Sequence, residues 1–220
     1  MAISTIPVLP LNAVLLPGTT MSLHIFEDRY LRLLADRATE QVVFAVSRIV
    51  RGQEVGGPAD FRSVGTTARL SKINAVSSKL IEITVVGEER TSLEDVNWEH
   101  GYATASMTSL PDLPVDEEEA FALASDQVRA FGDLLRLASR YIAGEFPLPI
   151  TVIDPESTSY ELARWLPLSI FEQQELLEER DPAARLRFIG KIIRRESRLI
   201  TRGGVAAFPL PQPGTRFSVN

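Results

Sequence analysis

The sequence predicts an α+β protein with a β-rich first part and a helical second part, on the evidence of two patterns. Before Pro111 the apolar residues form short runs separated by glycine, proline, asparagine and serine, which is typical of strands joined by turns. After Pro111 they recur every three or four positions, as on one side of a helix. We therefore expect a β lobe over residues 1–112, a helical lobe over residues 113–202 and an extended tail over residues 203–220.

The first part contains several runs with the composition of strands. Leu80 to Val86 alternates most clearly, and Ile81, Ile83 and Val85 fall on one face that we expect to be buried. The expected strands are Pro7–Leu11, Thr20–Ile25, Val42–Arg48, Val64–Ile73, Leu80–Val86, Thr91–Val96 and Tyr102–Ser109.

Between these strands the sequence predicts a tight turn, a helix and a loop. Pro17 and Gly18 suit a type II turn, because proline fixes φ at its first central position and glycine accepts the positive φ of the second. We expect a helix over about residues 27–37 and an exposed loop in the glycine-rich segment 49–62. The apolar residues on either side of the turn are core candidates: Leu9, Leu11, Val14, Leu16, Leu23 and Ile25.

The second part opens with a long helix. Asp116 is placed to cap its N-terminus, and Glu119 is placed to reach back and complete a capping box. We expect the helix to run to about Ala143. Its apolar stripe is Phe121, Ala124, Val128, Phe131, Leu135, Ala138 and Ile142. We expect this stripe to pack on the helical lobe itself, and a coiled-coil dimer is the alternative.

Three further helices are expected, each with its own start signal. An aspartate precedes a proline at Asp154 and at Asp181, and Ser169 with Glu172 has the spacing of a capping box. The last helix is expected over about residues 182–199. The expected core of this lobe is Tyr160, Leu162, Trp165, Leu166, Phe171, Leu176, Leu177, Leu186, Ile189, Ile193 and Leu199.

Composition argues against several classes of chemistry. The chain has no cysteine, which excludes disulfides, thiolate nucleophiles and cysteine-ligated metals. Its two histidines, His24 and His100, lack a metal-ligand spacing, and no serine lies in a known nucleophile motif. We therefore expect no catalytic residue, no metal site and no cofactor. The formal net charge of −6 and the lack of a long apolar run favour a cytoplasmic protein without a membrane partner.

The last expected helix carries a strip of basic residues. Its members are Arg180, Arg185, Arg187, Lys191, Arg194, Arg195, Arg198 and Arg202. Positive charge is favourable near a helix C-terminus, and Phe188 is the one aromatic residue among the arginines, so we favour a solvated or ion-paired face. The alternative is a nucleic-acid surface formed by Arg187, Lys191, Arg194, Arg195 and Arg198.

Two motifs near the start of the chain carry a resemblance to a known family. They are Ile6-Pro-Val-Leu-Pro-Leu-Asn-Ala-Val-Leu-Leu-Pro-Gly18 and, after it, Leu23-His-Ile-Phe-Glu-Asp-Arg-Tyr30. Further matching stretches lie at residues 64–70, 85–90, 160–168 and 172–178. Together they resemble the N-terminal substrate-binding domain of Lon proteases, in the form found in stand-alone bacterial Lon-domain proteins. The resemblance implies a PUA-like β-pseudobarrel followed by a helical bundle.

The resemblance also implies a function. In full-length Lon proteases this region is a recognition and assembly module, whereas proteolysis resides in an AAA+ ATPase domain and a serine–lysine protease domain. This sequence has no Walker motif and no peptidase dyad. The resemblance therefore implies a non-catalytic module that binds protein or unfolded polypeptide, with RNA binding through the barrel and the basic strip as the alternative.

The candidate binding residues are expected at a groove between the two lobes. They are His24, Phe26, Tyr30, Phe146 and Trp165. His24 is expected at the rim of the barrel. For Phe26 and Trp165 the competing interpretation is an ordinary place in the core. The sequence leaves the oligomeric state open.

Overall fold

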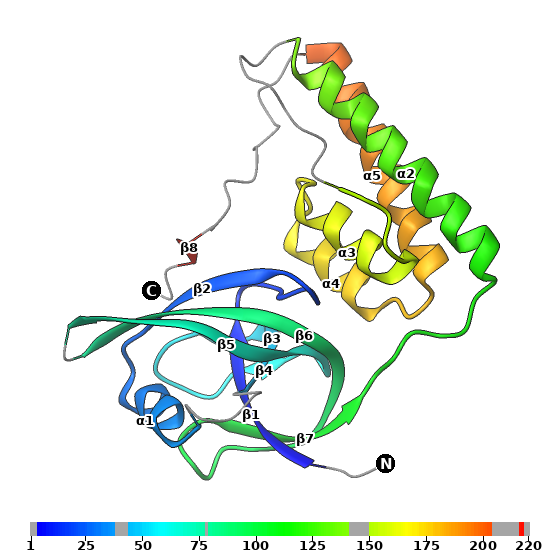
Figure 1. Ribbon diagram of the computed structural model, residues 1–220. Helices are drawn as coiled ribbons and strands as arrows, with labels where there is room; N and C mark the ends of the chain where they lie inside the picture. The colour runs from blue at the N-terminus through cyan, green and yellow to red at the C-terminus, as the bar shows by residue number, and fades with distance from the viewer. Residues whose placement is uncertain (1–3, 38–43, 78, 141–149, 204–215, 218–220) are drawn as a thin grey trace. The chain divides into compact units, whose positions relative to one another are not determined.

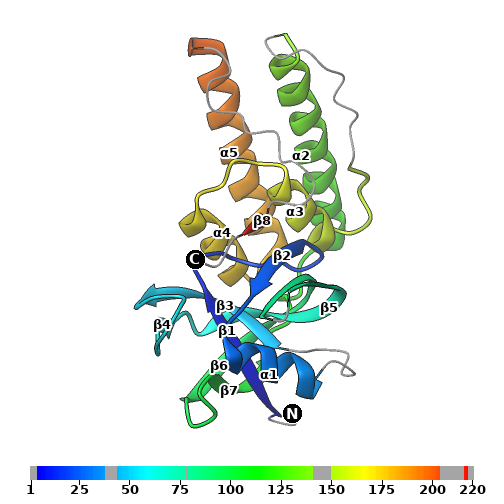
Figure 2. The ribbon, with the colours of Figure 1, turned by 90° about the vertical axis from the view of Figure 1, so that its left-hand side faces the viewer.

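The computed structural model describes residues 4–37, 44–77, 79–140, 150–203 and 216–217. It divides into two compact units, which we describe separately. Unit 1 comprises residues 1–111 together with 213–220, and unit 2 comprises residues 112–212. Figures 1 and 2 show that unit 1 holds the strands and one helix, and that the other helices lie in unit 2.

Unit 1 is a β-pseudobarrel. Its elements are β1 (Ser4–Leu11), β2 (Thr20–Ile25), α1 (Asp28–Arg37), β3 (Phe44–Arg51), β4 (Asp60–Phe61), β5 (Val64–Ser77), β6 (Leu80–Asn97), β7 (Ala103–Ser109) and β8 (Arg216–Phe217). β1 runs parallel to β3, and the antiparallel pairs β3–β5, β5–β6, β6–β7 and β7–β1 close the ring. β2 lies outside this ring beside the first half of β6, and β4 pairs with the end of β3.

The barrel is filled by the residues that the alternation predicts. Leu23, Ile83 and Val85 are fully buried, and all six core candidates around the predicted turn are buried as well. Leu33 and Leu34 of α1 belong to the same core cluster, so this helix packs on the barrel. Strand β1 is buried on both faces over its last six residues, as expected for a central strand.

The predicted turn at Pro17 and Gly18 is confirmed. The N–H of Thr19 donates to the carbonyl of Leu16 over 3.1 Å, and Gly18 has φ +74°, as the second central residue of a type II turn requires. The prediction of a loop without any element over residues 49–62 was wrong at both ends. β3 continues to Arg51, and residues 60–61 form the short strand β4 against it.

The prediction of two strands over residues 80–86 and 91–96 was also wrong, because β6 is one strand of 18 residues. Gly87, which suggested a break between two strands, instead allows the backbone of β6 to lie close to the turn before β2. Gly87 donates its N–H to the carbonyl of Thr19 and accepts from the N–H of Gly18, both over 2.9 Å. A glycine inside a strand allows such contact without ending the strand.

Replacing Gly87 with alanine is expected to lower the free energy of unfolding of unit 1 by about 1–3 kcal/mol. An added Cβ would lie 2.4 Å from the carbonyl oxygen of Leu16, which is backbone and cannot rotate away. Urea denaturation followed by the fluorescence of Trp98, in a Trp165→Phe background, measures this loss. Gly57→Ala is the matched control, because an added Cβ there meets no atom within 4 Å. Equal stabilities of the two variants would contradict the proposed close approach.

Unit 2 is a helical bundle. Its elements are α2 (Glu117–Ala138), α3 (Pro155–Arg164), α4 (Ile170–Glu178) and α5 (Pro182–Gly203). Helices α2 and α5 lie side by side and run in the same direction (Figures 1 and 2). The side chain of Gln127 on α2 packs against α5 at Gly190, where an added Cβ would lie 2.4 Å from its Oε1. This contact accounts for the glycine of the Phe188-Ile-Gly-Lys191 segment as a packing residue.

The predicted helix starts are confirmed, with one exception. Asp116 accepts a hydrogen bond from the backbone of Glu119, Asp154 accepts one from Ser157, and Asp181 accepts from the two residues after Pro182. The capping box at Ser169 is complete. The exception is the carboxylate of Glu119, which pairs with Arg187 on the neighbouring helix instead of reaching back to Asp116.

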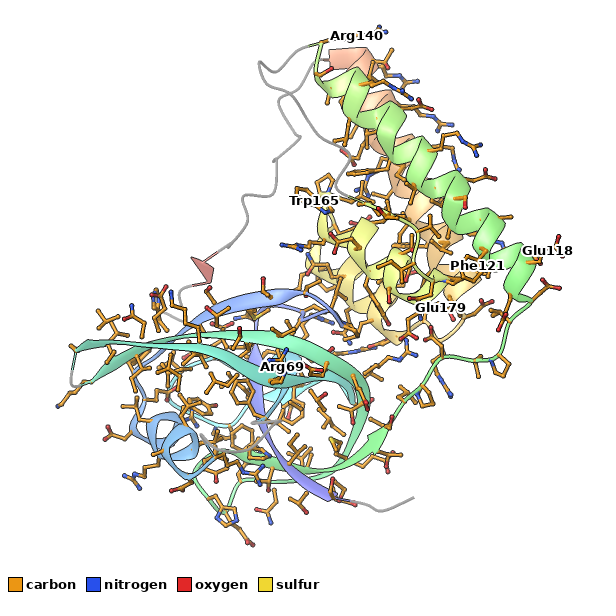
Figure 3. The ribbon with its side chains drawn as sticks, viewed as in Figure 1. Arg69, Glu118, Phe121, Arg140, Trp165 and Glu179 are labelled. Atoms are coloured by element: carbon orange, nitrogen blue, oxygen red, sulfur yellow. The ribbon has the colours of Figure 1, made fainter. Side chains whose placement is uncertain are left out.

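The predicted buried stripe of α2 is confirmed at Ala124, Phe131, Leu135 and Ala138. It was wrong at Phe121, which is 40% exposed (Figure 3), and Val128 is half-buried, whereas Ala120 and Gln127 are buried. The helix ends at Ala138 instead of about residue 143, and Ile142 lies outside the described residues. A pattern that counts apolar residues alone cannot predict the burial of the polar Gln127.

Two other predicted core residues of unit 2 are exposed. Phe171 is 70% exposed in the first turn of α4, and Leu199 is 48% exposed, with Ile200 buried in its place. Helix α5 continues to Gly203, four residues beyond the predicted end, and this extension brings Ile200 onto the buried face. The other predicted core residues on α3, α4 and α5 are buried, except Trp165, which is half-buried.

Glu172 is expected to make the stability of unit 2 depend on pH in the acidic range. Burial alone would raise the pKa of its carboxyl, but hydrogen bonds from Ser169 and the pairing with Arg195 lower it below its usual value. A lowered folded-state pKa gives stability that is present above about pH 4.5 and is lost as the pH falls through the folded-state pKa.

Replacing Glu172 with glutamine is therefore expected to lower the free energy of unfolding at pH 7 by about 0.5–2 kcal/mol and to flatten its decline below pH 4.5. Urea denaturation at a series of pH values, followed by the fluorescence of Trp165 in a Trp98→Phe background, measures both effects. Glu175→Gln, on the exposed side of the same helix, is the control and is expected to leave the curve unchanged. An unaltered acid decline in Glu172→Gln would contradict the assignment.

Candidate functional site

A shallow pocket opens in unit 1 where β1 and β2 end and α1 begins. Its lining consists of Leu9, Pro10, Leu11, His24, Ile25, Phe26, Glu27, Tyr30 and Glu54. The cavity volume is about 10 Å³, which is room for about one water molecule. Pockets that bury a small-molecule substrate are typically of ~300–1,000 Å³. The geometry therefore suits a single inserted group or an extended surface contact.

Two carboxylates hold the wall of this pocket in place. The backbone carbonyl of Glu27 accepts the first hydrogen bonds of α1, from Tyr30 and Leu31, each over 3.0 Å. Its carboxylate pairs with Arg29 at 2.9 Å and accepts from the N–H of Gly56 at 3.2 Å. The carboxylate of Glu54 accepts from the N–H of Asn12. The segment around Glu54 is thus tied both to α1 and to the end of β1.

Tyr30 forms the buried side of the pocket. It is 6% exposed, and the guanidinium of Arg29 lies 4.6 Å from the centre of its ring. Burial raises the pKa of Tyr30 to about 12, with Arg29 lowering it and Glu27 raising it. The phenol therefore remains neutral at physiological pH and can donate a hydrogen bond.

His24 and Phe26 form the exposed side of the pocket. His24 lies on the outward face of β2, with its Nε2 3.9 Å from a carboxylate oxygen of Glu82. Phe26 directly follows β2 and is 37% exposed. The competing interpretation of Phe26 as a core residue is therefore wrong. Together with Tyr30, three of the five residues predicted to bind line one pocket.

Trp165 does not line this pocket. Trp165 lies in unit 2 at the end of α3 (Figure 3), where its indole N–H donates to Glu161 over 3.0 Å and Arg164 lies 5.7 Å from its ring. Phe146 lies outside the described residues. Glu27 and Glu54 were not predicted as pocket residues. The sequence has no signal for Glu54, because its position depends on how the glycine-rich segment folds back.

The basic strip of α5 divides into buried, paired and exposed members. Arg187 pairs with Glu119, and Arg195 pairs with both Glu172 and Glu196. Lys191, Arg194, Arg198 and Arg202 are exposed and form no ion pair with another described residue. The pairing favours the predicted ion-paired face for Arg187 and Arg195, and leaves a shorter exposed stripe at helical spacing.

Arg185 does not belong to a surface strip, and its placement there was wrong. It is 0% exposed, and its guanidinium binds both carboxylate oxygens of Asp112. It also donates to Ser159 Oγ at 3.0 Å and to the carbonyl of Glu179 at 2.9 Å, and lies 4.6 Å from the ring centre of Tyr160. Burial alone lowers the pKa of Arg185, but Asp112 and Tyr160 raise it above its usual value, so the group stays charged. This network is structural.

The described residues contain no group of three or more histidine, aspartate or glutamate side chains arranged to hold a metal ion. None of the helices described is long and apolar enough to span a membrane.

Comparison with known proteins gives consistent matches over most of the chain. Residues 5–195 match the family described as the ATP-dependent protease La (LON) substrate-binding domain. The Lon N-terminal domain protein from Xanthomonas campestris is similar in structure, with a TM-score of 0.61 and 25% identity over 86% of this chain and 98% of that chain. The N-terminal domain of the Mycobacterium avium complex Lon protease has the same fold, with a TM-score of 0.62, 18% identity, and coverage of 87% and 98%.

Curated relatives are much longer than this chain. The Lon protease of Anaeromyxobacter dehalogenans is 26% identical over 90% of this chain and 24% of its own length. Lon protease 2 of Myxococcus xanthus is 24% identical over 89% of this chain and 24% of its own length. The chain therefore spans about a quarter of the length of these relatives.

Proposed function

The chain belongs to the LON substrate-binding domain family, and we propose that it is a non-catalytic module that binds extended or unfolded polypeptide at the pocket beside Phe26. The observation that carries this proposal is the position of Phe26. A large aromatic side chain is 37% exposed at the rim of a pocket whose wall includes buried Leu9 and Leu11. An exposed aromatic group next to an apolar hollow is typical of protein contact sites.

The size and charge of the pocket support an apolar polypeptide ligand. The cavity is too small to enclose a small-molecule substrate, but it can receive part of one side chain while the rest of a chain lies across Phe26. Glu27 is already paired with Arg29, and Glu54 already accepts a backbone hydrogen bond. Binding at this pocket is therefore expected to depend on apolar contact more than on ionic attraction.

Replacing Phe26 with serine is expected to weaken binding of a permanently unfolded protein by roughly tenfold, equivalent to about 1.4 kcal/mol. The probe is fluorescently labelled α-lactalbumin that has been reduced and carboxymethylated, and fluorescence anisotropy measures its dissociation constant. Val96→Ser is the matched control, because Val96 is 46% exposed in the same unit but does not line the pocket. Equal losses in both variants, or none in either, would contradict a site at Phe26.

RNA binding by α5 is a second candidate, favoured by the exposed stripe of Lys191, Arg194, Arg198 and Arg202. Salt separates the two functions. The affinity for unfolded protein is expected to hold or rise as the concentration of sodium sulfate or sodium chloride increases from about 50 to about 300 mM, because that affinity depends on apolar contact. The affinity for RNA is expected to fall by ~10-fold or more over the same range, because it depends on phosphate contacts. The double variant Lys191→Glu/Arg194→Glu is expected to leave unfolded-protein binding unchanged. A loss of unfolded-protein binding in this variant would favour the basic stripe as the binding site.

A further inference from the structure

Strand β2 has an outer edge that is mostly unpaired among the described strands. On its inner side all six residues pair with β6, from Thr20 opposite Val86 to Ile25 opposite Ile81. On its outer side, pairing among the described residues is limited to Ser22 and Leu23, which pair with β8. Residues 69–77 of β5 also pair on one side alone among the described strands, and the outer strand β4 is two residues long. The edge of β2 differs from these because a segment of the same chain already lies on it. An open edge offers unpaired N–H and C=O groups to another extended chain.

The segment that already lies on this edge shows which partner fits it. Arg216 and Phe217, close to the end of the chain, form a parallel strand against Ser22 and Leu23. The sequence Arg216-Phe-Ser-Val219 alternates polar and apolar residues, which is the pattern of a strand with one face against a protein. The backbone of β2 thus accepts an extended segment in parallel at Ser22 and Leu23.

The direction of this pairing leads toward the pocket. In the parallel register Arg216 is opposite Ser22 and Phe217 is opposite Leu23. The next positions of any chain bound in this register would lie opposite His24 and Ile25, and the one after them opposite Phe26. All three residues line the pocket. A strand advances about 3.3 Å per residue, so the docking edge and the pocket form one track about 15 Å long.

We propose that the outer edge of β2 is the docking strand of this protein, on which an extended polypeptide pairs in parallel and reaches the pocket, and that β8 occupies this edge until a ligand displaces it. This inference rests on the proposed function and adds its mode of recognition. Because β8 belongs to the same chain, its effective concentration at the edge is high even though the paired segment is short. A ligand must therefore compete with it.

The test compares the full chain with the double variant Arg216→Pro/Phe217→Pro, which removes both backbone donors of β8. The variant is expected to bind the carboxymethylated α-lactalbumin roughly tenfold more tightly than the parent chain. A labelled synthetic peptide of residues 209–220 is expected to bind the variant and not the parent, and to protect the amides of residues 20–25 from hydrogen exchange. The control Arg216→Ala/Phe217→Ala keeps both donors and is expected to bind within about threefold of the parent.

The outcomes separate this inference from the proposed function. If the parent chain and the proline variant bind the unfolded protein equally, the docking strand is refuted while polypeptide binding stands. If the peptide binds the variant without protecting residues 20–25, the docking strand is refuted as well. If neither chain binds unfolded protein, both the proposed function and this inference fail.

Discussion

Replacing Asp112 with alanine is expected to lower the free energy of unfolding of unit 2 by about 3–5 kcal/mol. The variant would leave the guanidinium of Arg185, which is 0% exposed, without the carboxylate that binds two of its nitrogens. A buried charge that has lost its partner keeps its full desolvation cost, and the remaining contacts to Ser159 and Glu179 involve neutral groups.

Removing both charges together is expected to cost far less. The double variant Asp112→Ala/Arg185→Met replaces the guanidinium with an apolar side chain that can fill part of the same volume, and we expect it to recover at least about half of the loss. Urea denaturation followed by Trp165 fluorescence, in a Trp98→Phe background, measures both variants. Asp126→Ala, which breaks the exposed pair with Arg129, is the control and should change stability by no more than about 0.5 kcal/mol. A loss below ~1 kcal/mol in Asp112→Ala would contradict the structural role of the network.

Unit 1 is expected to lose stability between pH 10 and pH 12 because of Tyr30. Its folded-state pKa of about 12 lies above the ordinary value of 10.0 that applies when the chain is unfolded. A raised folded-state pKa gives stability that is complete below pH 10 and is lost as the pH rises toward 12. The slope can reach about 1.4 kcal/mol per pH unit, so the total contribution of Tyr30 is about 2–3 kcal/mol.

The variant Tyr30→Phe is expected to remove this part of the alkaline decline. Urea denaturation at pH 9, 10, 11 and 12, followed by Trp98 fluorescence in a Trp165→Phe background, gives the difference between variant and parent at each pH. Tyr102→Phe, a half-buried tyrosine of the same unit, is the control that should keep the decline seen in the parent. If the free energy of unfolding declined equally with pH in Tyr30→Phe and in the parent, the assignment of the alkaline decline to a raised pKa of Tyr30 would be contradicted.

Local signals in the sequence predicted much of the fold. The turn at Pro17 and Gly18 and the helix starts at Asp154 and Ser169 depend on neighbouring residues alone, and each forms as predicted. Three of the candidate binding residues, all within the opening motif, also come together at one pocket. The interactions that fix the turn and the two helix starts lie within a few positions of one another along the chain, whereas the pocket also depends on Glu54 and Gly56 from a distant segment.

The predictions were wrong where contacts between segments distant in the sequence determine the structure. Gly87 resembles a strand end, but its contact with Thr19 and Leu16 comes from another part of the chain. Arg185 resembles a surface arginine until Asp112, 73 positions away, is placed against it. The exposure of Phe26 follows from the shape of the pocket, which no alternation of polar and apolar residues in the sequence could predict.

The central claim is that polypeptide binds to unit 1 along the end of β2 and the pocket, and hydrogen exchange in the presence of an unfolded protein tests it most directly. With carboxymethylated α-lactalbumin at a concentration near the dissociation constant of the full chain, we expect slower exchange at the backbone amides of residues 20–30 and 9–12 in the full chain, and little of this protection in Phe26→Ser at the same concentration. Protection confined to residues 187–202 of α5, with residues 20–30 unchanged, would contradict the claim.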